Sequence, residues 1–417
     1  MVKRFMVLVL GVTLSCQSNT TKVSETPDDK TEIPVMLTGG KSMPEVWVDS
    51  LTGYTVTRLS EGVDSGSFRS FYFHNYPFVK NEDGKGYKMI CYGDKHNGKQ
   101  IYTIDLEDGS LNQVTHQHGN MRGEILARKS ANIYYQIKDS VYVTNALTGK
   151  TDLITVFPDN FQAGVVSVNA NETLLAGTYS GAVKKEIYDK FPEKRDYFNR
   201  IYEAKLPHVL FTVNIETGEI DTLHQDNAWL NHVQFSPVDP EMLMFCHEGP
   251  WHKVDRIWTI NTKTKNITKI HRRTVNREIA GHEFWSPDGK QIWYDLQVPR
   301  GETFYLASNN LDTTDFRKYG LVRNEWSVHY TISPSQKLFA GDGGHEGSVA
   351  KAPDGKWIYL FKQEGDSLKS TKLVSLKEHD YGLEPNVHFT PDESHIIFRA
   401  NFEGKSQIYA VDLNSNS

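Results

Sequence analysis

Histidine recurs in this sequence at one fixed distance from a turn. In three stretches a histidine stands four residues before a Ser-Pro pair, and these histidines are His232, His282 and His329. A fourth stretch has Thr390-Pro391 as its turn, Asn386 at the matching position and His388 two residues later. Imidazole titrates near neutral pH and binds metals, so such a set suits proton transfer or a divalent Mn, Fe, Ni or Zn ion. The recurrence predicts one shared site if the fold brings these stretches around a common axis.

Each of these stretches has the pattern of two short strands joined by a tight turn. Apolar and polar residues alternate on both sides of the turn, as in "GHEFWSPDGKQIWYDL" from Gly281 and "NVHFTPDESHIIFRAN" from Asn386. A third strand and a polar hairpin accompany such units, as in "LFTVNIETGEIDTLH" (210–224). Units of about 45–60 residues with four short strands are typical of β-propeller blades.

The number of such units predicts an all-β fold, a seven-bladed β-propeller with four-stranded blades. The first three blades are expected at about 71–115, 123–156 and 165–224, the next three open near His232, His282 and His329, and the last opens near Asn386. The stretch 45–60 has the pattern of outer strands that no inner strand precedes. We therefore expect the N-terminal strands to join the last blade and close the ring, which removes exposed sheet edges. The first strand of each blade would line the central channel, where the histidines would converge.

Charge narrows the choice of partners. The net charge of −6 does not suggest a nucleic-acid-binding protein, which would normally present a basic face. The stretch "KKEIYDKFPEKRDYFNR" (184–200) has mixed charge at helical spacing. It predicts a solvated helical insertion in the third blade, and the alternative is a basic lid over an acidic substrate.

The N-terminus has the pattern of a targeting segment. Lys3 and Arg4 precede the apolar run 5–14, which is too short to span a membrane, and Leu14-Ser15-Cys16 resembles a lipoprotein cleavage box. We expect a lipoprotein-type signal segment at 1–16, a flexible tether at 17–43 and the propeller domain at 44–417. This predicts a bacterial periplasmic or outer-membrane-anchored lipoprotein that contacts the membrane only through Cys16; an ordinary cleaved signal is the alternative. Cys91 and Cys246 lie in apolar strand patterns and are expected to be buried thiols.

Four stretches together resemble the oligogalacturonate lyase family. They are "CHEGPWHKVDRIW" (246–258), "GHEFWSPDG" (281–289), "LFAGDGG" (338–344) and "EPNVHFTPD" (384–392), and the similarity runs from about residue 45 onward. The resemblance implies a seven-bladed propeller that cleaves short pectin fragments, the oligogalacturonates, by β-elimination. In that reaction a base removes the C5 proton of a galacturonate unit, while a divalent metal, Mn²⁺ in the family, stabilises the charge that develops on the carboxylate.

The resemblance also implies roles for individual residues. The metal would be held by His329, Asn386 and His388, with Glu384 as a fourth candidate; Asn386 stands where the family has histidine, and the family's preceding glutamine is absent. Arg256 and His282 correspond to the catalytic pair. His282 would serve as general base, and Arg256 would bind the substrate carboxylate or assist proton transfer. A salt bridge from Arg256 to Asp255 or Glu248 is the structural alternative.

Three further histidines, His247, His232 and His74, are candidates for contacts with the substrate. His247 lies in the Cys-His-Glu-Gly-Pro stretch, where a turn-stabilising role is the alternative, and His74 opens the first blade. Two other functions stay open at this point. One is a lyase or hydrolase acting on a different uronic-acid oligomer, and the other is a non-catalytic periplasmic propeller that binds sugars.

Overall fold

The computed structural model describes residues 32–415 except 41, 95–97, 160 and 162. The chain divides into a short unit, 1–33, and a large unit, 34–417. The predicted signal segment, its Cys16 and the tether up to residue 31 lie outside the described residues. In the part that is described, no helix is both long and apolar enough to cross a membrane.

The large unit consists mostly of short antiparallel strands grouped into sheets. The first three sheets follow one another in the chain and are made of β4 (Ser67–Arg69), β5 (Phe78–Lys80), β6 (Tyr87–Asp94), β7 (Gln100–Asp105) and β8 (Leu111–Gln113); β9 (Met121–Leu126), β10 (Asn132–Ile137), β11 (Ser140–Asn145) and β12 (Thr151–Val156); and β13 (Ala163–Val168), β14 (Leu174–Ser180), β15 (His208–Asn214) and β16 (Ile220–Asp226). These bounds lie within a few residues of those predicted from the repeat pattern.

The next three groups of four strands continue the same plan. They are β17 (Trp229–Phe235), β18 (Met242–Glu248), β19 (Ile257–Asn261) and β20 (Ile267–Lys269); β21 (Ile279–Trp285), β22 (Gln291–Gln297), β23 (Phe304–Asn310) and β24 (Phe316–Leu321); and β25 (Tyr330–Ile332), β26 (Leu338–Gly341), β27 (Trp357–Glu364) and β28 (Ser367–Ser375). A single parallel pair, Gly320 with Ser367, joins the last two groups at their outer strands.

The final sheet combines both ends of the large unit. It contains β29 (His388–Phe389), β30 (His395–Ala400), β31 (Gln407–Asp412), β3 (Thr55–Arg58), β2 (Val46–Asp49) and β1 (Val35–Met36). Strand β3 pairs antiparallel with β31, as predicted for closure by the N-terminal strands. Strand β1 falls inside the stretch expected to be a tether and pairs with β2, so ordered structure begins before the predicted boundary at residue 44.

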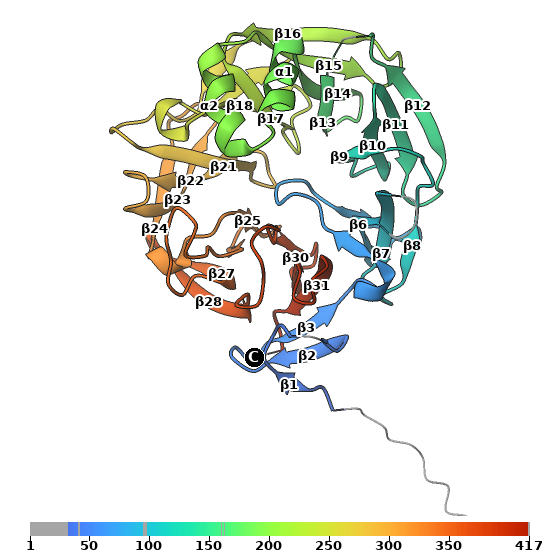
Figure 1. The fold of residues 1–417 in the computed structure, drawn as a ribbon, viewed down its shortest axis with the longest axis vertical. Helices are drawn as coiled ribbons and strands as arrows, with labels where there is room; N and C mark the ends of the chain where they lie inside the picture. The colour runs from blue at the N-terminus through green and yellow to red at the C-terminus, as the bar shows by residue number, and fades with distance from the viewer. Residues whose placement is uncertain (1–31, 41, 95–97, 160, 162, 416–417) are drawn as a thin grey trace, which may run out of the picture. The chain divides into compact units, whose positions relative to one another are not determined.

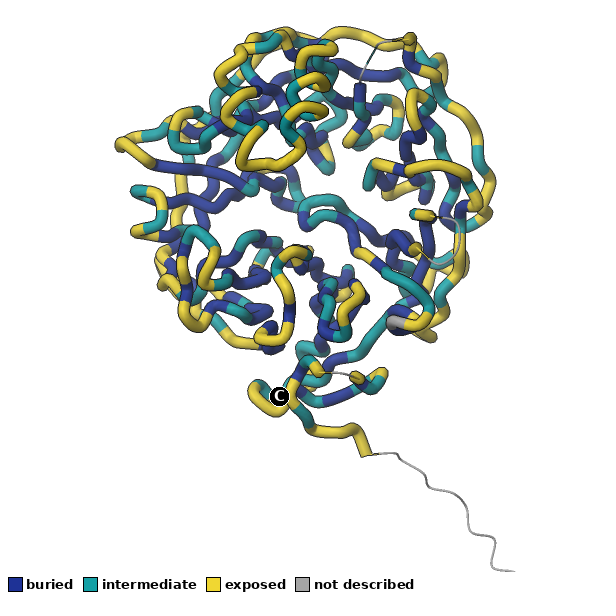
Figure 2. Tube along the Cα trace, viewed as in Figure 1, coloured by how far each residue is buried: buried dark blue, intermediate teal, exposed yellow. Residues whose placement is uncertain are grey.

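Hydrophobic cores lie between neighbouring sheets and hold the sheets in sequence around a common centre (Figure 1). Tyr92 of β6 packs in one cluster with Ile133 of β10, and Met244 of β18 packs in another with Tyr294 of β22. A cluster that contains Met89 of β6 and Ile408 of β31 joins the first sheet to the last. Because the middle strands are covered on both faces, β7 is buried along its whole length. Figure 2 shows buried strands toward the centre and exposed turns at the periphery.

Two segments outside the sheets approach the centre. The segment 70–77, between β4 and β5, reaches the middle of the sheet arrangement (Figure 1). Between β14 and β15 the chain forms α1 (Ala182–Lys190) and α2 (Lys194–Ala204), which is the helical insertion expected from the sequence. Short 3-10 turns occur at η1 (Val63–Ser65), η2 (Trp251–Lys253) and η3 (Arg323–Glu325). Cys91 and Cys246 are free and buried, as predicted.

Candidate active site

The repeated position before the Ser/Thr-Pro turn has an unusual backbone conformation. His232, His282 and Asn386 have φ values of 47°, 51° and 51°, in the left-handed region that non-glycine residues rarely adopt. At His232 and His282 the pairing of the inner strand with its neighbour shifts register around the histidine. Such strained positions are often associated with function. The sequence spacing therefore marks a repeated bulge in the inner strands. At the bulge, the side chain of the repeated residue no longer follows the regular alternation between the two faces of the strand.

A cavity of about 100 Å³ lies at this level of the molecule. Its walls come from the 70–77 segment, from α2, and from loops and inner strands of several sheets. The lining residues are Tyr72, Phe73, His74, Lys194, Phe198, His232, Glu248, Trp251, Arg256, His282, Glu283 and Glu384. Five of the residues predicted from the sequence thus meet here, namely His74, His232, Arg256, His282 and Glu384.

His329 lies directly beside this cavity. Its ring stacks on Phe73 with centroids 4.6 Å apart and lies 5.0 Å from the His282 ring. Its Nδ1 is 2.8 Å from Asp342 Oδ2, so the proton sits on Nδ1 and the lone pair on Nε2. That Nε2 is 3.2 Å from the Tyr72 hydroxyl and 3.8 Å from Glu384 Oε2. His329 and Glu384 therefore present a nitrogen and a carboxylate oxygen to the same space.

In this structure the side chains of Asn386 and His388 are engaged elsewhere and do not lie with His329 and Glu384 as a group of metal ligands. Asn386 Oδ1 accepts a hydrogen bond from the Phe73 amide at 2.9 Å, and its Nδ2 donates to the Glu384 carbonyl. His388 Nε2 donates to the Phe71 carbonyl at 3.0 Å, and its ring lines a different cavity of about 530 Å³. The expectation that His388 points to the same side as Asn386 assumed a regular strand. The left-handed Asn386 breaks that alternation, and β29 begins only at His388.

His282 and His74 are held as neutral imidazoles. Burial, reinforced by the nearby His329 and Arg256, keeps the pKa of His282 well below its usual range. Burial, followed by the influence of His232, lowers the pKa of His74 to about 3. The Nδ1 atoms of both rings are buried and have no hydrogen-bond partner among the described residues. Neutral rings with unpartnered nitrogens offer lone pairs that can bind a cation.

A buried aspartate stands behind His282. Asp295 Oδ2 lies 3.9 Å from His282 Nδ1, and burial raises the pKa of Asp295 to about 7. The indole of Trp326 donates to Asp295 Oδ1 at 2.9 Å, and Gln297 Nε2 donates to Oδ2 at 3.1 Å. The carboxyl group is thereby fixed on the Nδ1 side of the His282 ring.

Arg256 is a fully paired, buried cation. Its Nη1 donates to Glu248 Oε1 at 2.7 Å, its Nε donates to Glu283 Oε2 at 2.9 Å, and its guanidinium lies over Trp251. Burial alone would lower the pKa of Arg256. The electrostatic effect of Cys246, Glu248 and Glu283 is larger than that of burial, so the pKa lies well above its usual value. The ion pair with Glu248 is therefore formed, and Arg256 carries its positive charge in this structure.

The Asp255 alternative does not occur. Asp255 accepts from Lys269 at 2.7 Å and from Arg273 at 3.3 Å instead of pairing with Arg256. Arg256 precedes β19, and its side chain points toward the cavity with Glu248 and Glu283.

A second possible ligand group lies at the edge of the cavity. Ligand atoms of His232, Cys246 and Glu248 lie within 4.8 Å of one another, and His232 Nε2 is 3.3 Å from Glu248 Oε2. Burial raises the pKa of the Cys246 thiol well above its usual value, which disfavours the thiolate that binds metals. Glu248 is also committed to Arg256. This group is thus less suited to a metal ion than the pair His329 and Glu384.

His247 lies away from the cavity. Its ring stacks on Trp258 at 4.7 Å, and its Nε2 is 3.9 Å from Asp226. Neighbouring residues of a strand point to opposite faces, and Glu248 faces the cavity, so His247 of β18 faces the other side.

The sequence did not reveal several residues that line the cavity or support its walls. Tyr72 carries no pattern that could have marked it. Glu248, Glu283 and Asp342 lie inside the stretches that carry the family resemblance but were given no role in the site. Lys194 and Phe198, four residues apart on α2, line the cavity, so the helical insertion contributes to its wall.

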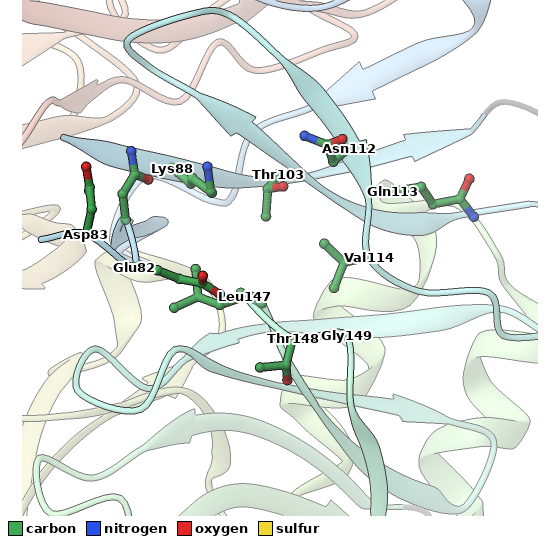
Figure 3. A pocket seen from close by; sticks show the side chains of 12 residues that line it. Glu82, Asp83, Lys88, Thr103, Asn112, Gln113, Val114, Leu147, Thr148 and Gly149 are labelled. Carbon is green, nitrogen blue, oxygen red and sulfur yellow. The ribbon is translucent and has the colours of Figure 1, made fainter. Parts of the chain in front are cut away.

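A separate depression is lined by residues of the first two sheets and their loops (Figure 3). Its volume is about 560 Å³, and its lining includes Glu82, Asp83, Lys88, Asn112 and the turn 146–149. No histidine is among its lining residues. This larger depression therefore lacks the imidazole groups that line the smaller cavity.

Comparison with known proteins decides the family. A family model described as oligogalacturonate lyase matches residues 39–417. The chain belongs to the oligogalacturonate lyase family. This lyase is 26% identical over 385 residues to oligogalacturonate lyase of Dickeya dadantii, which covers 88% of the chain and 95% of the relative. It is also 26% identical over 387 residues to oligogalacturonide lyase of Pectobacterium atrosepticum, with 88% and 95% covered.

Solved structures agree with this assignment. The crystal structure of oligogalacturonate lyase from Vibrio parahaemolyticus has a TM-score of 0.76 and 26% identity, with 89% of this lyase and 97% of that chain covered. A structure of an oligogalacturonate lyase in complex with manganese has the same TM-score of 0.76 at 24% identity, with 91% and 99% covered, and supports the fold. The family resemblance and the lyase class predicted from the sequence are confirmed.

Proposed function

We propose that this lyase cleaves oligogalacturonates, short fragments of pectin, by β-elimination. A base removes the C5 proton of a galacturonate unit, the C4–O bond to the neighbouring sugar breaks, and the departing oxygen takes up a proton. The products are an unsaturated uronate end, which rearranges to a keto form, and a shortened oligomer. The observation that carries the proposal is the neutral, buried His282 beside His329 and Glu384 in a cavity that also holds cationic side chains.

His282 is the proposed base. Its ring lines the cavity, burial keeps the ring neutral by lowering its pKa, and the Asp295 carboxyl group stands 3.9 Å from its Nδ1. A neutral imidazole can accept the C5 proton at working pH, and the imidazolium that forms is stabilised by the nearby carboxyl group. Asp295 would act by orienting His282 rather than by touching the substrate.

Cationic groups would hold the substrate carboxylate. Arg256 is locked in place by Glu248 and Glu283, which leaves its charge permanent and its position fixed. Lys194 extends from α2 into the same cavity. We propose that Arg256 and Lys194 orient the uronate, with His232 and His74 contacting the sugar from the cavity wall.

A divalent cation, which we propose to be Mn²⁺, would be held by His329 Nε2 and Glu384. The donor set fits such an ion because Asp342 fixes the tautomer of His329 and because buried Nδ1 atoms of His282 and His74 lack partners among the described residues. When bound, the cation would supply Lewis-acid stabilisation of the negative charge that develops on the substrate carboxylate. The manganese complex of a related lyase supports this choice of metal.

We further propose that the sheets form a seven-bladed propeller at 44–417, extended by β1, and that the chain is a periplasmic or outer-membrane lipoprotein anchored at Cys16. The four-stranded groups and the cluster that joins the first sheet to the last support the propeller. The apolar run before Cys16 supports the anchor. Radiolabelled palmitate incorporated into the wild type but not into Cys16→Ser would be expected, and labelling of neither would overturn the anchor.

The activity is tested with purified protein and digalacturonate or trigalacturonate, with added Mn²⁺ and with a chelator. We expect new ultraviolet absorbance from the unsaturated product with Mn²⁺ and none with the chelator. Metal-dependent activity on another uronic-acid oligomer, with none on galacturonates, would contradict the assignment of oligogalacturonates as the substrate. The absence of product from every uronate would overturn catalysis.

A further inference from the structure

A basic groove lies on loops of the β17–β20, β21–β24 and β25–β28 groups. It is a depression of about 840 Å³. Its cationic lining, which defines the basic groove, consists of His252, Arg277, Arg300, Arg323 and Lys351. Glu302 is the carboxylate among its lining residues. None of these residues has a role in the proposed reaction.

The positive charge of this groove is largely uncompensated. Arg277 lies 3.8 Å from Glu302, and both side chains are more than half exposed. For Arg300, Arg323 and Lys351, no carboxylate of the described chain lies within ion-pair distance, and all three residues are exposed. Elsewhere on the surface many cations have an acidic neighbour, as Arg317 has Asp315. The groove thus concentrates positive potential that a polyanion would reduce.

Backbone contacts hold the walls of the groove together. Arg323 Nη2 donates to the Gly301 carbonyl at 3.2 Å, and Nη1 donates to the Ala350 carbonyl. The Arg323 guanidinium also lies over the Phe304 ring. Loops from two strand groups are therefore tied to one arginine, and the groove is formed before any ligand binds.

The basic groove and the proposed active site both use the turn η2. Trp251 lines the cavity and the next residue, His252, lines the groove, both within the 3-10 turn η2. Burial lowers the pKa of His252, and Arg300 and Lys253 lower it further, which reflects the same positive field. The turn η2 is therefore a wall that the cavity and the groove have in common.

We propose that the basic groove binds the carboxylates of uronate units beyond those held in the cavity. The inference rests on the proposed function. A cavity of about 100 Å³ is far below the roughly 300–1,000 Å³ of sites that enclose drug-sized ligands, so further sugars of an oligomer must lie outside it. Each uronate unit carries one carboxylate, and arginine binds carboxylates through paired hydrogen bonds. Arg300 and Lys351, which have no acidic partner in the described part of the chain, are the residues assigned to this contact.

The test compares short and long substrates in one variant, Arg300→Gln/Lys351→Gln. We expect the KM for tetragalacturonate to rise about tenfold, because charge-assisted contacts to the distal units are lost, while kcat and the KM for digalacturonate stay unchanged. Lys337→Gln/Lys362→Gln removes the same charge from exposed residues outside the groove and should leave both substrates unaffected. An unchanged KM for tetragalacturonate, or an equal rise in KM for both substrates, would show that the groove does not bind the distal uronate units.

Calorimetric titration with tetragalacturonate separates this inference from the proposed function. A wild type that binds tetragalacturonate about tenfold more tightly than the variant supports the groove, whether or not either protein turns substrate over. Equal affinity of the wild type and the variant for tetragalacturonate would contradict the proposed role of the groove. Turnover of digalacturonate by the wild type tests the reaction separately.

Discussion

Asp342 lies directly behind His329 and holds it by two hydrogen bonds. The carboxylate accepts from the His329 amide at 2.7 Å and from Nδ1 at 2.8 Å, and both side chains are completely buried. Because the carboxylate fixes the tautomer, we predict that Asp342→Asn weakens Mn²⁺ binding about 10–100-fold. Calorimetric titration with Mn²⁺ measures this, with the exposed Asp312→Asn as control. Equal affinity in wild type and Asp342→Asn would remove His329 from the metal site.

His388 and His329 are expected to differ in their effect on the metal. His329→Ala should abolish Mn²⁺ binding, whereas His388→Gln should retain it, because His388 Nε2 is engaged by the Phe71 carbonyl and a glutamine amide can make that bond. The same titration distinguishes the two variants. Loss of binding in both would mean that the loaded site reorganises to include His388.

His282→Gln tests the proposed base. Removing a general base costs about 10²–10⁴-fold in rate, so we expect kcat on digalacturonate to fall by that factor. The urea midpoint should stay close to that of the wild type, since Nδ1 of His282 makes no hydrogen bond with the described residues. His118→Gln, at an exposed position, serves as control. Full activity of His282→Gln would assign the base elsewhere.

Arg256 should matter for stability as well as for substrate binding. Arg256→Met leaves two buried carboxylates, Glu248 and Glu283, without their partner, and we predict a loss of about 3–5 kcal/mol in the free energy of unfolding. Arg256→Met combined with Glu248→Gln and Glu283→Gln should recover much of that loss, because no buried charge remains. Urea unfolding of both variants measures the difference. A single variant as stable as the wild type would contradict the buried ion-pair network.

Buried neutral histidines predict a loss of stability in acid. Burial is the main cause that lowers the pKa of both His208 and His379 to about 4. The unfolded chain, with an ordinary histidine pKa of about 6.5, binds protons that the folded chain does not, so stability is full above pH 6.5 and falls as the pH drops toward 4. His208→Asn, which can keep the hydrogen bond to the Leu206 carbonyl, should reduce this fall. Urea midpoints at pH 7 and pH 5 measure it, and an unchanged slope would contradict the assignment.

Local patterns in the sequence were sufficient for much of the fold. Alternating residues around Ser-Pro and Thr-Pro turns predicted the strand groups, and the stretch 45–60 predicted the pairing of β3 with β31. These features follow from short-range rules, because alternation and turn chemistry act over a few residues. The tether boundary was less accurate, since the two-residue strand β1 is too short to give a periodic signal.

The sequence by itself determined that histidines would recur at equivalent positions of successive strand groups, and that a mixed-charge helical segment would interrupt one of them. Only the tertiary structure decided which atoms meet. Asn386 adopts a left-handed conformation that directs His388 elsewhere, and Asp342 fixes the ring of His329. Tyr72 and Lys194 come from distant segments to complete the cavity. Spacing along a chain records the backbone period, whereas the direction of a side chain at a bulge and the partners that pack against it depend on contacts between residues far apart in sequence.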